Sequence, residues 1–134
     1  MTSKDFGQKG KWRLAVTDEF SASHQLRHFK GKCERLHGHN FGVKAVVEGQ
    51  TLEPDTEILI DFGELKAHLK EVLADLDHTH LNELEYFKTR NPSSENLAQH
   101  IFQALQKSLT HKNIRLASVT VSEKAGSSAA YLEE

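Results

Sequence analysis

The stretch Cys33-Glu34-Arg35-Leu36-His37-Gly38-His39-Asn40 places the only cysteine of the chain ahead of two histidines that flank a glycine. The residues after it alternate with the period of a strand that has one face in a core, with Phe41, Val43, Ala45 and Val47 on one side and Gly42, Lys44, Val46 and Glu48 on the other. His37 and His39 share the parity of Phe41. Because same-face residues of a strand lie ~6.6 Å apart, these two imidazoles can converge on one ion.

A third imidazole comes from an earlier stretch. His24 shares its parity with Trp12, Leu14, Val16, Phe20 and Ala22, so it too is expected to face the core. Three neutral imidazoles with a fourth position open are the ligand set of a catalytic zinc, whereas structural zinc sites are closed by four protein ligands, usually cysteines. One cysteine is too few for such a closed site. The residues therefore predict a zinc site at His24, His37 and His39; the alternative is a loop-to-strand junction with solvated imidazoles.

Composition predicts one ordinary globular domain over residues 1–134. The chain is 37% hydrophobic and 27% charged, with a formal net charge of -2 and no basic stripe of the kind that binds nucleic acid. No apolar run is long enough for a membrane span, and residues 1–11 are expected to be a loose arm, not a signal peptide. A single cysteine is consistent with a reducing, cytoplasmic setting.

The pattern predicts an α+β fold in the order ββααββ, with both helices on one face of an antiparallel sheet. Strands are expected over 12–24, with a possible bulge at 17–19, and over 37–49, with a short extension at 58–60. A helix should begin at Asp61, with Glu64 in capping-box position, and bury a stripe that includes Phe62; a second should begin after the start signals of 91–96. Strands over 113–123, with a bulge near 117–118, and over 129–132 complete the order.

Several separated blocks resemble one family when taken in order. They are Phe20-x-Ala22-x-His24, Cys33-x3-His37-Gly38-His39, Ile60-Asp61-Phe62-x-Glu64-Leu65-Lys66, Leu76-Asp77-His78-x-x-Leu81-Asn82, Asn91-Pro92-Ser93-Ser94-Glu95-Asn96-Leu97 and Ser122-Glu123. Together they are similar to the 6-pyruvoyltetrahydropterin synthase family. The three residues between Cys33 and His37 favour its 6-carboxytetrahydropterin synthase branch, which serves queuosine biosynthesis, because the pyruvoyl branch usually has five.

The resemblance implies the tunnelling fold, in which subunits close their sheets into a barrel, commonly as a hexamer of two trimers with active sites between subunits. It also implies a zinc-dependent carbon-carbon lyase. The substrate would be 7,8-dihydroneopterin triphosphate, and the products 6-carboxy-5,6,7,8-tetrahydropterin, acetaldehyde and triphosphate.

The resemblance also implies roles for individual residues. Cys33 would be the general base as its thiolate, with His78, oriented by Asp77, in the proton relay. Glu123 would anchor the pterin and share in the relay, with Ser93 and Ser94 as further pterin contacts. Oligomerisation is expected to bring Glu123 of one chain near the zinc of its neighbour.

Each of these residues has a simpler interpretation. Cys33 could be an inert small apolar residue, Asp77 and His78 a polar helix end, and Glu123 a solvated charge. Four further histidines are taken as surface or capping residues: His28, His80, His100 and His111. Two other functions stay open, namely 6-pyruvoyltetrahydropterin synthase activity and a non-catalytic metal- or pterin-binding module.

Overall fold

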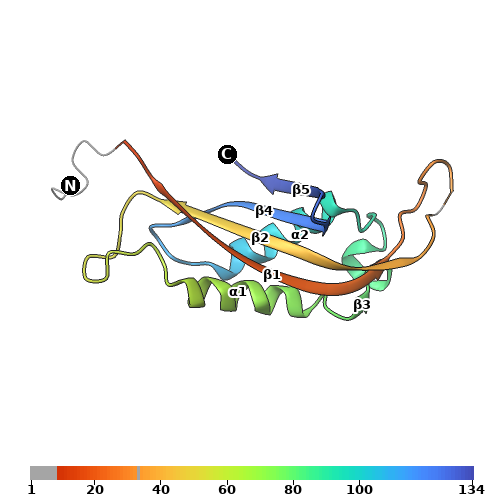
Figure 1. Cartoon of the computed structure of the whole chain (residues 1–134), viewed down its shortest axis with the longest axis horizontal. Helices are drawn as coiled ribbons and strands as arrows, with labels where there is room; N and C mark the ends of the chain where they lie inside the picture. Colours follow the sequence, from red (N-terminus) through yellow and green to blue (C-terminus); the bar gives the residue numbers. More distant parts are fainter. Residues whose placement is uncertain (1–8, 33) are drawn as a thin grey trace.

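A computed structural model of the chain describes residues 9–32 and 34–134. Its elements in order are β1 (Trp12–His24), β2 (His37–Gly49), α1 (Phe62–Ala74), β3 (Thr79–His80), the short 3-10 turns η1 (Leu81–Glu83) and η2 (Glu85–Phe87), α2 (Ser94–Ser108), β4 (Arg115–Lys124) and β5 (Ser127–Leu132). The sheet order is β3-β1-β2-β4-β5, and long, bowed β1 and β2 form its spine (Figure 1). The predicted α+β class is confirmed, with β3 as an added edge strand.

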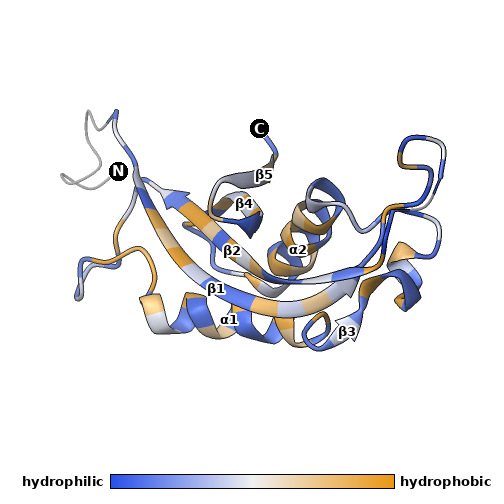
Figure 2. Ribbon diagram, turned by 45° about the vertical axis from the view of Figure 1, so that its right-hand side comes forward, coloured by the Kyte–Doolittle hydropathy of each residue, from blue (hydrophilic) through white to orange (hydrophobic). Residues whose placement is uncertain are grey.

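One face of the sheet and both helices share a single core. Phe20 of β1 and Phe41 of β2 pair directly in the register and stack with ring centroids 4.9 Å apart. Figure 2 shows the underlying alternation as bands of contrasting hydropathy along β1. The helices contribute the other half of the core through Leu65, Leu69 and Leu73 of α1 and Leu97, Ala98, Ile101, Phe102 and Leu105 of α2.

The two predicted bulges have opposite outcomes. Val46 pairs with Ser118 and Val47 with Leu116, so Ala117 is the extra residue and the bulge near 117–118 is confirmed. The bulge at 17–19 is wrong, because β1 pairs with β2 without a shift from Trp12 to His24. The polar residues there need no bulge, since β3 covers only the far end of β1 and leaves this edge open to water.

Side-chain caps set the start of both helices as predicted. The Glu64 N–H donates to the Asp61 carboxylate (3.1 Å), and the Asn96 N–H donates to the Ser93 hydroxyl (3.1 Å). Two local predictions are wrong. Phe62 is 60% exposed in the first turn of α1, and residues 58–60 form no strand but end in a bend at Leu59 and Ile60. No helix in the described residues is long and apolar enough to cross a membrane.

A buried carboxylate ties three elements together at the far end of β2 from its histidines. Glu48 is only 4% exposed and lies between its cross-strand partners Arg13 and Arg115. Arg115 (2.5 Å), Arg13 (2.8 Å) and Lys11 (3.1 Å) all contact it. These hydrogen bonds, of which the one from Arg115 has the largest effect and the one from Arg13 the next largest, lower the pKa of Glu48 to about 2.

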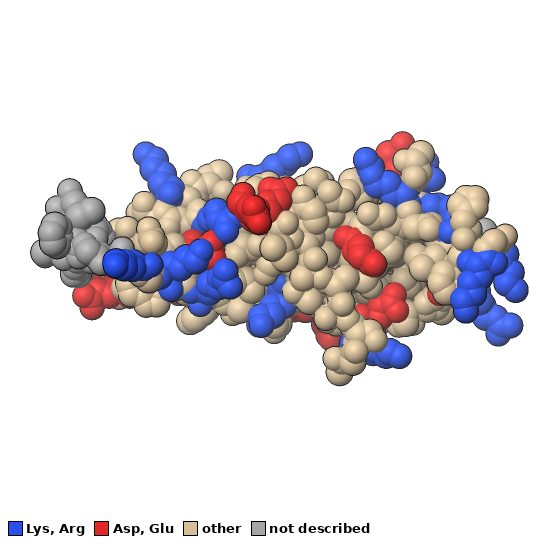
Figure 3. All heavy atoms as spheres, turned by 90° about the horizontal axis from the view of Figure 1, so that it is seen from above, with Lys and Arg blue, Asp and Glu red and all other residues tan. Residues whose placement is uncertain are grey.

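Figure 3 shows lysines and arginines gathered toward both ends of the elongated molecule.

The Glu48 ion cluster predicts a pH-dependent contribution to stability. Its folded pKa of about 2 lies below the ordinary 4.5, so the contribution is complete above pH 4.5 and is lost as the pH falls toward 2. Glu48→Gln should lower the free energy of unfolding at pH 7 by about 2 kcal/mol, a figure reduced for screening by water around the cations. Urea unfolding at pH 7 and pH 3 should show less than half of that loss at pH 3. The exposed Glu19→Gln is the control; an equal loss at both pH values would contradict the account.

Candidate active site

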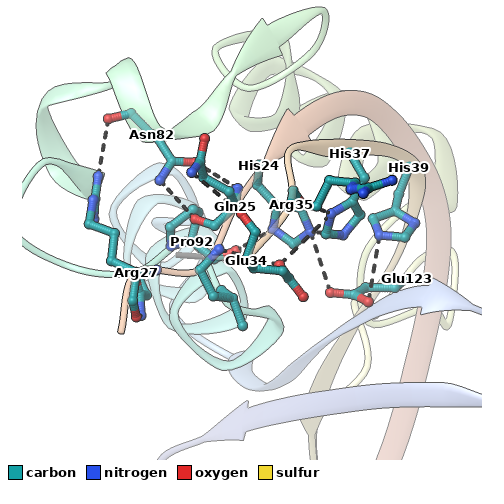
Figure 4. Close-up of polar contacts among 12 residues, drawn as sticks. His24, Gln25, Arg27, Glu34, Arg35, His37, His39, Asn82, Pro92 and Glu123 are labelled. Atoms are coloured by element: carbon teal, nitrogen blue, oxygen red, sulfur yellow. Dashed lines mark hydrogen bonds and ion pairs between the residues drawn. The ribbon is translucent and has the colours of Figure 1, made fainter. Parts of the chain in front are cut away.

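The antiparallel register brings three histidines together at the end of β1 and the start of β2. His24 pairs with His37, and Ala22 pairs with His39, so all three imidazoles project from one face of the two strands. One ring nitrogen of each lies within 4.8 Å of the others (Figure 4). His24 is 1% exposed and its two partners are half-buried. The structure thus brings together the three residues that the sequence predicts as ligands.

Backbone carbonyls fix the protonation of two of these rings. The Nδ1 atom of His24 lies 2.7 Å from the Pro92 oxygen, and that of His37 lies 2.8 Å from the Arg35 oxygen. Since a carbonyl only accepts, each Nδ1 carries the proton and each neutral ring keeps a lone pair on Nε2. These two Nε2 atoms face each other at 3.1 Å. Burial lowers the pKa of His24, which favours the neutral ring that a metal ion needs as a ligand.

The third ring supports the same occupant. His39 Nε2 is buried and has no hydrogen-bond partner among the described residues. Ring nitrogens around a tetrahedral zinc lie roughly 3.4 Å apart, given Zn–N distances of about 2.1 Å. The spacing of these nitrogens, the two facing lone pairs and a third buried nitrogen that makes no hydrogen bond with the described residues therefore fit a zinc ion held by His24, His37 and His39. Sequence reasoning missed Pro92 and Arg35 as the groups that orient the rings, because a backbone carbonyl has no side-chain signature.

Glu123 stands beside the triad at the end of β4. Its two carboxylate oxygens lie 3.6 Å from His24 Nε2 and 3.6 Å from His39 Nε2 of the same chain (Figure 4). The expectation that Glu123 approaches the zinc of a neighbouring chain is therefore wrong. The direct pairing of β4 with β2 delivers the carboxylate within the chain.

Glu123 also lines a hollow of about 240 Å³. Ser94 donates to the Glu123 carboxylate (3.5 Å) from the first turn of α2. Ser93 lines the same hollow, although its hydroxyl already caps the helix by accepting from Asn96. The structure brings these three predicted substrate-binding residues to one place. The other lining residues are Leu26, Glu95, Ser127, Ser128 and Ala129.

Asp77 and His78 form a dyad on the outer edge of β1. Asp77 accepts from the Ser21 N–H (2.8 Å) and from the His78 ring (2.9 Å), and both bonds, the first more strongly, lower the pKa of Asp77. His78 has a φ of 59° and a side chain that is 81% exposed. Ser21 precedes His24 by roughly 10 Å along the strand. His78 and His39 line one open hollow of about 460 Å³, but no hydrogen bond or ion pair in the described residues joins the dyad to the triad.

The remaining predicted residues have different outcomes. Cys33 lies outside the described residues, but the next residue, Glu34, places a carboxylate oxygen 3.8 Å from His37 Nδ1. His28 is exposed, His80 contacts the Ser23 hydroxyl (3.0 Å) and His111 pairs with Glu64. His100 is not a surface residue: it is half-buried against Tyr86, with centroids 4.3 Å apart, and burial lowers its pKa.

Comparison with known proteins agrees with this geometry. The family model for 6-pyruvoyl tetrahydropterin synthase matches residues 13–134. The chain belongs to the 6-pyruvoyl tetrahydropterin synthase family. The predictions of this family and of an enzyme are thereby confirmed.

Two similar relatives carry the name of the 6-carboxy branch of the family. The chain is 38% identical to the 6-carboxy-5,6,7,8-tetrahydropterin synthase of Synechocystis over 71% of its length and 75% of the relative. It is 37% identical to a putative 6-carboxy-5,6,7,8-tetrahydropterin synthase of Archaeoglobus fulgidus, over 78% and 85%. The solved 6-pyruvoyl tetrahydropterin synthase of Caenorhabditis elegans superposes with a TM-score of 0.80 at 26% identity, covering 93% of this chain and 97% of that one.

The geometry predicts that the metal depends on His37. The protein as purified should contain about one zinc ion per chain, and His37→Ala should lose most of it, because two imidazoles alone hold zinc weakly. Metal analysis after gel filtration measures this directly. His80→Ala, a nearby imidazole outside the triad, is the control and should keep its zinc. Unchanged zinc content in His37→Ala would exclude this site.

Proposed function

We propose that this enzyme is a zinc-dependent lyase that converts 7,8-dihydroneopterin triphosphate to 6-carboxy-5,6,7,8-tetrahydropterin, acetaldehyde and triphosphate, in the route to queuosine and other deazapurines. The observation that carries the proposal is the set of three imidazoles with facing lone pairs beside a carboxylate-lined hollow. The three-residue spacing between Cys33 and His37 and the two 6-carboxy relatives favour this product.

The hollow beside Glu123 suits the polar edge of a pterin. A carboxylate can accept two parallel hydrogen bonds, here from the 2-amino group and the adjacent ring N–H. The Ser94 hydroxyl is within 3.5 Å of the same carboxylate and can turn to a ring heteroatom. With its pterin in this hollow, the substrate would direct its side chain past Glu123 toward the triad.

Proton transfer is assigned to Cys33 and the dyad. A thiolate near imidazoles and cationic side chains is a suitable base at neutral pH. Asp77 accepts from His78 Nδ1, so His78 Nε2 is left free to take up or deliver a proton. A bound zinc ion would act as a Lewis acid on the substrate's side-chain oxygens and so acidify the adjacent C–H bond.

The loop that carries Cys33 is also the basic end of the molecule nearest the triad. Four cations lie within nine residues there: Arg27, Lys30, Lys32 and Arg35. The right-hand end of Figure 3 shows this concentration of positive charge. A triphosphate would be attracted to this end by long-range electrostatics, which are effective within about 10 Å at moderate salt.

Two alternatives keep the same site. The similarity to the Caenorhabditis elegans structure also fits 6-pyruvoyltetrahydropterin synthase activity, in which triphosphate is eliminated and acetaldehyde is not formed. The second is a metal- or pterin-binding module without turnover. The product of the reaction separates all three.

The proposed chemistry predicts distinct losses on substitution. With 7,8-dihydroneopterin triphosphate, the wild-type protein should release acetaldehyde and a product with the mass of the 6-carboxy compound. Cys33→Ala should keep the zinc and the fold but lose kcat by about 100-fold or more, because the thiolate transfers a proton and does not bind metal. Mass spectrometry and metal analysis of the same samples test both claims. Loss of zinc from Cys33→Ala would make the cysteine a fourth ligand.

We also propose that the exposed dyad serves the site of a neighbouring chain in a homo-oligomer. Among the described residues, only Ala22 and Ser23 pair with another strand at the outer edge of β1, and such an open edge can pair with another chain. Pairing there would bring His78 toward a second subunit, whereas Glu123 already serves its own.

This arrangement predicts complementation between two inactive variants. Cys33→Ala and His78→Ala chains, mixed, dissociated and reassembled, should regain part of the activity, because some sites then hold an intact copy of each residue. Gel filtration with light scattering must first show an oligomer, and each variant reassembled alone is the control. Recovery no greater than in the controls would place Cys33 and His78 in the same chain's site.

A further inference from the structure

Two asparagine side chains hold the chain immediately after the buried ligand His24. The Gln25 N–H donates to the Asn82 Oδ1 (2.9 Å), and the Asn82 amide donates back to the Gln25 carbonyl (2.8 Å). Asn91 repeats the same pair of bonds on Arg27, at 2.8 Å in each direction. Each carboxamide thus satisfies both backbone groups of one residue, as a neighbouring strand would.

The residue between the two clamped positions faces the other way. The Leu26 carbonyl accepts from the Glu34 N–H (2.7 Å), and the Leu26 N–H donates to the Glu34 carboxylate (3.3 Å). Glu34 directly follows Cys33 and approaches His37. Residues 25–27 therefore form hydrogen bonds on both sides, as a strand within a sheet does. The side chains of Asn82 and Asn91 are the partners on one side, and Glu34 is the partner on the other.

Arg27 ties the two clamps to each other. Its guanidinium donates to the Phe87 carbonyl (2.7 Å), the Arg90 carbonyl (3.1 Å) and the Asn82 carbonyl (3.4 Å). Asn91 in turn precedes Pro92, whose carbonyl holds the His24 ring. Figure 4 shows Asn82 between Arg27 and Gln25, with the triad beyond them.

We propose that Asn82 and Asn91 are positioning residues of the active site, which set the orientation of His24 and the path of the Cys33 loop without touching the substrate. The proposal rests on the zinc function above. A carboxamide is the side chain suited to this, because it presents one donor and one acceptor in a plane, as a peptide group does. The sequence contains both asparagines in its family-like blocks, but the proposed reaction leaves them without a role.

The test uses Asn82→Leu and Asn91→Leu, which keep the size of the side chain and remove both hydrogen bonds. Zinc affinity of the purified protein, measured by competition with a chelator, should fall about 10- to 100-fold in each, as for other groups that orient a ligand. With substrate at saturating zinc, kcat should fall about 10-fold or more and KM should rise by a smaller factor, because Leu26 lines the hollow but neither clamp holds its polar residues Glu123 and Ser94. Amide hydrogen exchange at Gln25 or Arg27 should become fast in the matching variant.

Val47→Ala controls for loss of stability, since it opens a cavity in the core at the far end of β2. It should lower the unfolding midpoint without changing zinc affinity or exchange at residues 25–27. Fast exchange at Gln25 in Asn82→Leu with unchanged zinc affinity and kcat would overturn the positioning role. If wild-type protein bound no zinc, the proposed function itself would fail, and the inference with it, although slow exchange at Gln25 and Arg27 would still show the clamps.

Discussion

The site depends on the unbroken antiparallel register of β1 with β2. Side chains alternate strictly between the faces of a strand, so a slip of one residue would turn His37 and His39 away from the core face and leave His24 alone. The Phe20–Phe41 stack lies in the same register and on the same face. The aromatic packing that stabilises the fold therefore also fixes the geometry of the triad, a few residues further along the same strands.

Much of this could be predicted from the sequence, because strand parity is a local property. The alternation around Phe41 predicts strand β2, and the capping residues Asp61 and Ser93 predict the starts of α1 and α2, because each signal depends only on neighbouring residues. The same alternation predicts that the histidine side chains face the core. The family-like blocks indicated the same ligands independently.

The features that the sequence did not predict correctly depend on contacts between residues far apart in the chain. β3 exists because the chain after α1 lies beside Ser21 and Ala22, and nothing in residues 79–80 alone indicates a strand. The placement of Glu123 within its own chain follows from the register of β4 on β2, which local pattern does not reveal. The two asparagine clamps are likewise invisible in the sequence, since each joins residues more than 50 positions apart.

Three contacts fix the position and orientation of His24. They are the pairing of β1 with β2, the Pro92 carbonyl that accepts from its ring, and the hydrogen bonds of Asn82 to the next residue, Gln25. These constraints are unfavourable in themselves, because they hold two neutral Nε2 lone pairs at 3.1 Å and bury a third nitrogen that makes no hydrogen bond with the described residues. A cation between the rings would relieve both unfavourable features at once. A metal ion held by these rings would therefore stabilise this end of the sheet, and the contacts that orient the rings would keep them in place for it.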